Sequence, residues 1–389
     1  MLGFATFAAL LPELRDLWRL TNAEAGLIAS AFFAGYVATV SYWTALTDRT
    51  DGRRVYLAGC LLATAGGAGF GLAADGLASG MLFHVLLGAG VAGTYMPGLR
   101  LLSDRSSGPT QSRTIAFYTS FFGIGTAISL ALAGVLAPAF GWRSAFVVSA
   151  SGPVLAGFMV FAFVPAIPGW KRVQNKFSLA SLFPVASWRK VLADRAAAGY
   201  TLGYVAHCVE LFGSRGWMVA FLAYSAGLQA AGEQFPWNFA AIAAAVNLLA
   251  VPASIFGNEI ALRIGRRQWI QIAMFASGAC GIVLALCGAL HWSIVIALLI
   301  VYSMLVMAES ATLTAGLVAA VPAELRGAAL GLYSLAGFTG GMLGPSLFGV
   351  ALDLAGGKMD GVAWVWAYAA IGAGCIGAPV VVRLFARVR

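Results

Sequence analysis

The stretch Asp48-Arg49-Thr50-Asp51-Gly52-Arg53-Arg54 joins two long apolar runs, and it is the part of the sequence that decides the fold. Its last three residues occur again 213 positions downstream as Gly265-Arg266-Arg267. A proline and an arginine repeat at the same separation, at positions 109 and 113 and again at 322 and 326. Because two separate landmarks share one spacing, the sequence predicts a duplicated half.

The composition indicates an integral membrane protein. Apolar residues make up 60% of the 389 residues and charged residues only 10%, whereas about a quarter of an ordinary soluble protein is charged. This excludes a soluble enzyme, a disordered chain and a small secreted disulfide scaffold. A membrane-spanning helix needs about 20 apolar residues. Runs of that length lie near residues 23–47, 54–75, 79–103, 114–139, 144–165, 196–223, 237–261, 268–290, 292–320, 327–352 and 363–382.

An apolar stub, Met1–Leu11, precedes these runs and ends at Pro12. As a helix it would rise only about 17 Å, which is too short for a hydrocarbon core of about 30 Å. The repeat places the first-half partner of the run at 196–223 at about −17 to 10. We therefore expect the stub to be the second half of a first helix, with about 17 residues missing upstream of Met1. The next helix should open with a capping box, Thr21 and Glu24.

The basic residues are distributed unevenly between the loops. Of the 24 Lys and Arg residues, 18 fall in loops on one side of the predicted spans and four on the other, while Arg100 and Arg215 lie inside apolar runs. Because cytoplasmic loops carry the excess of Lys and Arg, we expect the first side, with the C-terminus, to be cytoplasmic. The chain is expected to be a multi-pass protein of the inner cell membrane. The same loops account for the net charge of +9 without a nucleic-acid partner.

The stretch at 48–54 resembles the cytoplasmic signature of the major facilitator superfamily. A degenerate second copy around Arg263, Gly265, Arg266 and Arg267 lies where that family repeats it, and the Gly141-Trp142-Arg143 turn is also similar. Thr44, one extra residue before Gly52, and Leu262 depart from the pattern. The resemblance implies an all-α fold of twelve helices in two pseudo-symmetric halves, residues 1–165 with a partial first helix and 196–389, joined by a cytoplasmic linker at 166–195. It also implies a secondary transporter that works by alternating access.

The resemblance further implies a conformational latch. In that family Asp48, Arg49, Arg53 and Asp104 would form an ionic latch that holds the halves together in the outward-open state, and Gly52, Arg54, Arg266 and Arg267 complete the two copies of the signature. The alternative is that these charges only determine topology.

Polar side chains in the middle of the spans are candidates for the substrate and proton site, because burying an ionisable group there costs several kcal/mol. These candidates are His207, Glu210, Arg215, Glu309, Tyr204, Tyr95 and Arg100. Glu210 or Glu309 would take the proton, His207 could tune it, and Arg215 could hold an anionic group. The alternative is a buried Glu210–Arg215 or His207–Glu210 pair, in which the two side chains only satisfy each other's charge and hydrogen bonds. Arg100 could instead extend to the cytoplasmic face.

The motifs do not indicate an enzyme. No HExxH, G-x-S-x-G or P-loop pattern occurs in the sequence, and His207-x-x-Glu210 offers two metal ligands where a catalytic zinc needs about three. We expect no metal and no cofactor, with a proton gradient as the energy source, and a monomer in the lipid bilayer. Because two arginines lie within spans, the predicted function is uptake of a small anion. The alternatives are proton-driven efflux of lipophilic or cationic compounds and a non-transporting membrane receptor.

Overall fold

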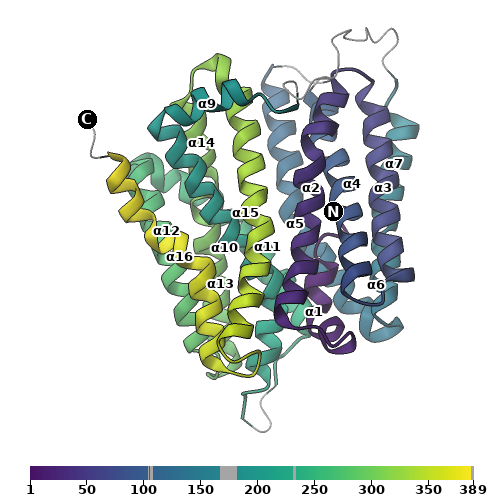
Figure 1. Cartoon of the computed structure of the whole chain (residues 1–389), viewed down its shortest axis with the longest axis vertical. Coiled ribbons are helices and arrows are strands. Elements are labelled where there is room, and N and C mark those ends of the chain that lie inside the picture. Colours follow the sequence, from purple (N-terminus) through teal and green to yellow (C-terminus); the bar gives the residue numbers. More distant parts are fainter. Residues whose placement is uncertain (104, 106–107, 167–181, 231–233, 387–389) are drawn as a thin grey trace. The chain divides into compact units, whose positions relative to one another are not determined.

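The computed structural model describes the chain except residues 104, 106–107, 167–181, 231–233 and 387–389. The described part is helical, with helices that run alongside one another within each unit (Figure 1). Their bounds are α1 Thr6–Leu17, α2 Asn22–Thr47, α3 Gly52–Ala73, α4 Leu77–Ser103, α5 Gly108–Phe140, α6 Trp142–Ser149, α7 Ser151–Phe163, α9 Val185–Ala193, α10 Arg195–Ala226, α11 Phe239–Ile264, α12 Arg266–Leu286, α13 Trp292–Ala308, α14 Ser310–Ala320, the 3-10 turn η1 Ala323–Leu325, α15 Arg326–Leu354 and α16 Gly361–Ala386.

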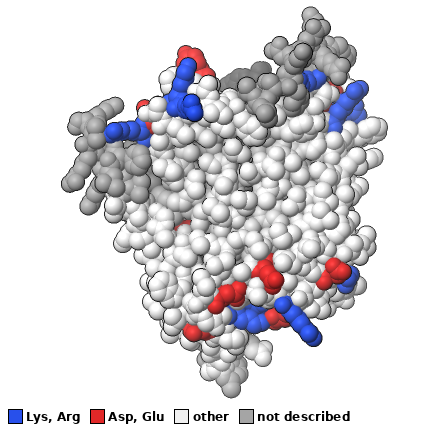
Figure 2. Space-filling view, in the orientation of Figure 1, with Lys and Arg blue, Asp and Glu red and all other residues white. Residues whose placement is uncertain are grey.

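Ten of these helices or helix pairs are long and apolar enough to cross a membrane. They match the predicted apolar runs, and the predicted all-α membrane fold is confirmed. The helix α10 is not among the ten, although it has 32 residues, because the polar residues along it lower its hydropathy. Figure 2 shows that the charged side chains on the visible face gather at the ends of the helices, as expected for helices whose middle parts lie in lipid.

The start of each helix follows its local sequence. Thr21 and Glu24 form the predicted capping box, in which the Thr21 amide donates to the Glu24 carboxylate at 2.8 Å and the Glu24 amide to the Thr21 hydroxyl at 3.1 Å. The Asp194 carboxylate likewise accepts the amide of Ala197 at 2.8 Å, which begins α10. Gly265 precedes α12 with φ +97°, a conformation that favours glycine.

The chain forms two compact units, and the first holds Met1–Leu10 and Ala31–Phe183. Its helices approach one another at glycines. A Cβ atom on Gly88 of α4 would stand 1.8 Å from the carbonyl oxygen of Phe32, and one on Gly35 of α2 would stand 2.1 Å from that of Val85. The backbones of α2 and α4 are therefore in direct contact, as small residues allow between membrane helices.

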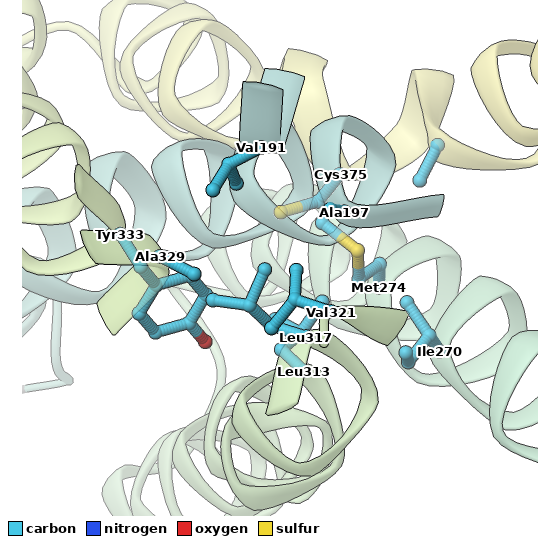
Figure 3. Packing of buried hydrophobic residues seen from close by; sticks show 11 residues of the cluster. Val191, Ala197, Ile270, Met274, Leu313, Leu317, Val321, Ala329, Tyr333 and Cys375 are labelled. Carbon is cyan, nitrogen blue, oxygen red and sulfur yellow. The ribbon is translucent and has the colours of Figure 1, made fainter. Parts of the chain in front are cut away.

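The second unit holds Leu11–Ser30 and Pro184–Arg389. One apolar cluster packs α9, α10, α12, α14, α15 and α16 together, and Figure 3 shows its side chains. The cluster consists of Val191, Ala197, Ile270, Met274, Leu313, Leu317, Val321, Ala329, Tyr333, Cys375 and Ala378.

The membership of residues 11–30 in this second unit was not anticipated by the predicted boundaries at 165 and 196. Its cause is Asp353, at the end of α15, whose carboxylate caps the first turn of α2. It accepts the amide of Asn22 at 3.2 Å, the side-chain amide of Asn22 at 2.7 Å and the amide of Ala23 at 2.7 Å. Lys358 also pairs with Asp16. Residues 22–30 of α2 thus belong to the C-terminal unit, and the helix from Ala31 onward belongs to the first.

Candidate functional site

A break in a spanning helix positions Glu309. Helix α13 ends at Ala308 and α14 begins at Ser310, with Glu309 between them at φ −95° and ψ −11°. The break leaves the carbonyl oxygen of Ala308 to accept the Trp269 indole N–H at 3.1 Å. A Cβ atom on Gly257 of α11 would stand 1.8 Å from the same oxygen. The interrupted turn is therefore held from two neighbouring helices.

Glu309 pairs with His207 across the unit. The Nδ1 atom of His207 lies 2.9 Å from Oε1 of Glu309, and the two side chains are 1% and 0% exposed. The other carboxylate oxygen of Glu309, Oε2, is buried and has no hydrogen-bond partner among the described residues. Such a pair can gain or lose a proton and has spare hydrogen-bonding capacity on the carboxylate.

A stack of tyrosines orients the imidazole. The Tyr204 ring lies 5.7 Å from that of His207, at an interplanar angle of 16°, and 3.8 Å from that of Tyr333, at 8°. The Tyr333 hydroxyl is 3.1 Å from that of Thr314. The sequence predicted Tyr204 as a site residue through its helical spacing to His207. It did not single out Tyr333 and Thr314, because the sequence contains many other residues with hydroxyl groups.

Glu210 lies three residues from His207 but contacts other helices. Its Oε2 accepts the Ser277 hydroxyl of α12 at 2.8 Å, and the side chain is 1% exposed. Neither pair considered from the sequence, Glu210–Arg215 or His207–Glu210, forms in the described structure, because the helix break brings Glu309 to the imidazole instead. Among the described residues no group of three metal-ligating side chains occurs.

Arg215 has an unusual environment for a cation within a spanning helix. Its Nη2 lies 3.5 Å from the thioether sulfur of Met307, two residues before Glu309. No carboxylate in the described part of the chain lies within salt-bridge distance of it. The side chain keeps part of its surface exposed, whereas the residues on either side of it are buried. A partly exposed guanidinium with a soft neutral neighbour can accept an anion.

The candidate residues of the first unit are arranged separately. The Tyr95 ring stacks on Tyr118 at 5.5 Å, and the Tyr118 hydroxyl donates to the carbonyl oxygen of Tyr95 at 2.9 Å. Arg100 pairs with Asp48 and donates to the Thr47 hydroxyl at 3.0 Å. Arg100 thus reaches the 48–54 stretch; the sequence analysis considered its extension toward that side of the spans but did not predict the pairing with Asp48.

The other residues of the predicted latch differ from the expectation. Arg53 donates to the carbonyl oxygen of Phe161 at 2.6 Å and lies over the Phe161 ring, rather than beside an acid. Asp104 lies outside the described residues. The remaining members are Arg49 in the turn after α2, Gly52 and Arg54 in the first turn of α3, and Arg266 and Arg267 in the first turn of α12. The latch itself stays a prediction.

Comparison with known proteins assigns the family. The family model of the Major Facilitator Superfamily matches residues 1–345. The chain belongs to this superfamily. The family and the candidate membrane spans of the described helices agree with the multi-pass membrane protein that the sequence predicted.

Solved structures and curated relatives extend this assignment. One similar solved structure is a bacterial homolog of the human lysosomal transporter Spinster, in an inward-facing and unoccupied conformation. It superposes with a TM-score of 0.75 at 16% identity, over 99% of this chain and 92% of the other. This similarity is one of fold. The niacin transporter NiaP of Acinetobacter baylyi is 27% identical over 151 residues, or 39% of this chain and 33% of the relative. The 4-hydroxybenzoate transporter PcaK of the same organism is 28% identical over 166 residues, or 41% of this chain and 35% of the relative. These matches span about a third of each curated relative's length.

Proposed function

We propose that this transporter imports a small organic monoanion together with protons. The observation that carries the proposal is Arg215, a guanidinium within the helix α10 that contacts the Met307 sulfur and no described carboxylate. An arginine at the centre of a spanning helix costs about 2.5–3.5 kcal/mol. A cation retained there without a protein counter-ion is suited to a ligand that supplies the negative charge.

The proton is assigned to the His207–Glu309 pair. The pair is almost completely buried, so its net charge has a large effect on its surroundings. With one exchangeable proton the pair is neutral, and with two it is positive. Arg215 and His207 share the helix α10, and Met307, which contacts Arg215, lies two residues from Glu309. A change of charge at the pair therefore changes the electrostatic potential at the proposed anion site.

The relatives suggest which anions to test first. The names of NiaP and PcaK give niacin and 4-hydroxybenzoate as their substrates. Both compounds carry one carboxylate on an aromatic ring, which matches one guanidinium. We therefore propose an aromatic monocarboxylate as the substrate class, in a monomeric transporter of the inner cell membrane with a cytoplasmic C-terminus.

The test uses purified protein in proteoliposomes with labelled nicotinate and 4-hydroxybenzoate. Counterflow, in which unlabelled anion inside exchanges for labelled anion outside, reports anion binding and movement without net proton transport. Uptake driven by an acidic exterior reports coupling. Arg215→Ala should abolish both, whereas Glu309→Gln should keep counterflow and reduce accumulation driven by the pH gradient.

The matched control is Arg143→Ala. Arg143 lies over the Trp142 ring at 4.4 Å, at the start of α6, and has no part in the proposed site. It should transport like the wild type. Counterflow that persists in Arg215→Ala would refute the anion site. Counterflow of lipophilic cations in place of anions would support the alternative, proton-driven efflux of cationic compounds.

A further inference from the structure

Glu210 lies in a second buried polar cluster of the C-terminal unit, apart from the His207–Glu309 pair. Its neighbours come from three other helices: Ser277 of α12, Tyr302 of α13 and Cys375 of α16. Its Oε1 atom is buried and has no hydrogen-bond partner among the described residues. The Tyr302 hydroxyl interacts with Glu210 but is likewise buried without a hydrogen bond of ordinary length. Two buried polar atoms without a hydrogen bond of ordinary length therefore lie in one cluster.

The negative charge of this carboxylate has no protein counter-ion. Within the helices that the structure describes, no Lys, Arg or His lies within salt-bridge distance of Glu210. The Ser277 hydroxyl, its one ordinary hydrogen-bond donor, also lies 2.9 Å from the carbonyl oxygen of Met274 and divides its proton between two acceptors. A buried ionised carboxylate in this setting is costly, and binding a proton removes the cost.

Four titratable side chains interact with Glu210. The titratable side chains that interact with it are Cys280 of α12, Tyr302 of α13, Cys375 of α16 and Glu309 at the helix break. The first three are neutral near pH 7 in their ordinary state, so Glu309 is the one that can be charged alongside Glu210. Negative charges on these two carboxylates would repel each other.

We propose that Glu210 is a second proton-binding site and that the transporter moves two protons with each monoanion. This inference rests on the proposed function. One proton binds the His207–Glu309 pair and one binds Glu210 from the outer side, and both leave to the cytoplasm with the anion. Each cycle then carries a net charge of about +1 inward, so that uptake responds to the membrane potential as well as to the pH gradient.

The test measures nicotinate accumulation in proteoliposomes whose membrane potential is set by potassium and valinomycin. At zero potential and a gradient of one pH unit, one proton per anion supports about tenfold accumulation, and two protons support about hundredfold. Wild type should approach the second value, and an inside-negative potential should stimulate its uptake. Glu210→Gln should fall to the first value and lose the response to potential. The control, Glu24→Gln, alters a half-buried capping carboxylate outside the proposed site and should behave like wild type.

Two results would overturn the inference: wild-type uptake that does not respond to potential, or a Glu210→Gln variant that keeps the response. If Glu210→Gln does not fold, the potential dependence of the wild type decides alone. Absence of anion counterflow in the wild type would instead refute the proposed function. In that case the infrared band of protonated carboxylic acids still tests Glu210, because the difference between the wild-type and Glu210→Gln spectra should contain a pH-dependent component. A difference spectrum without such a component would overturn the inference.

Discussion

The His207–Glu309 pair predicts a specific pattern of stability in a double-mutant cycle. Removing one partner of a buried ion pair costs about 3–5 kcal/mol, because the other charge is left without compensation. With its side chains 1% and 0% exposed, this pair has no water to take over that role. His207→Ala should therefore cost about 3 kcal/mol or more in free energy of unfolding. Glu309→Gln should cost about 1 kcal/mol, since the amide can still form a hydrogen bond with the imidazole.

The informative quantity is the coupling between the two changes. In the double variant the glutamine carries no charge that could be left unpaired, so its cost should be smaller than the sum of the single costs by about 2 kcal/mol. Unfolding in mixed detergent micelles, followed by tryptophan fluorescence, gives the free energies. His291, which is exposed at the start of α13, supplies the control, and His291→Ala should combine additively with Glu309→Gln. Additivity within about 0.5 kcal/mol for the His207 cycle would refute the reasoning.

Three further outcomes follow from contacts elsewhere in the chain. Asp353→Ala removes the carboxylate that caps the first turn of α2 with three hydrogen bonds and should lower the free energy of unfolding by about 2–4 kcal/mol, while Asp353→Asn should lose less; equal losses would argue against a charge-dependent cap. Gly257→Ala places a Cβ atom 1.8 Å from a carbonyl oxygen of α13 and should abolish the yield of folded protein. Size-exclusion chromatography in detergent measures this yield, and a normal yield would contradict the close contact. For Asp16, burial raises the pKa, but the hydrogen bond from Lys358 and the charge of Arg15 outweigh it and hold the pKa below its usual range. The ion pair contributes under about 1 kcal/mol to stability, because it is largely exposed. This contribution is present above the ordinary pKa of the carboxylate and is lost as pH falls below about 4. The difference in melting temperature between wild type and Asp16→Asn should therefore vanish at low pH, and a constant difference would exclude this ion pair as its source.

The sequence predicted most of the helical framework. The apolar run at 237–261 corresponds to α11, Phe239–Ile264, and the run at 196–223 to α10, Arg195–Ala226. Helix bounds are predictable in this way because each span must satisfy its backbone hydrogen bonds internally and present apolar side chains to lipid. The capping box of Thr21 and Glu24 is local for the same reason, since its two partners are three residues apart.

The sequence also identified the side chains that needed an explanation. His207, Glu210, Arg215 and Glu309 stand out because each is polar within an apolar run, and they could be found without any knowledge of the fold. What the sequence left open was which of them meet. It offered Glu210 as a partner of both His207 and Arg215, and the structure forms neither pair.

The sequence by itself therefore determined that this protein is a membrane-embedded helical protein with a few ionisable groups inside its apolar runs. The tertiary structure alone decided that His207 meets Glu309 across 102 residues, and that Asp353 caps a helix 331 residues before it. The reason is physical. Secondary structure in lipid depends on hydrophobicity and hydrogen bonds along one segment, whereas the partner of a buried charge depends on how separate helices pack and where one of them breaks.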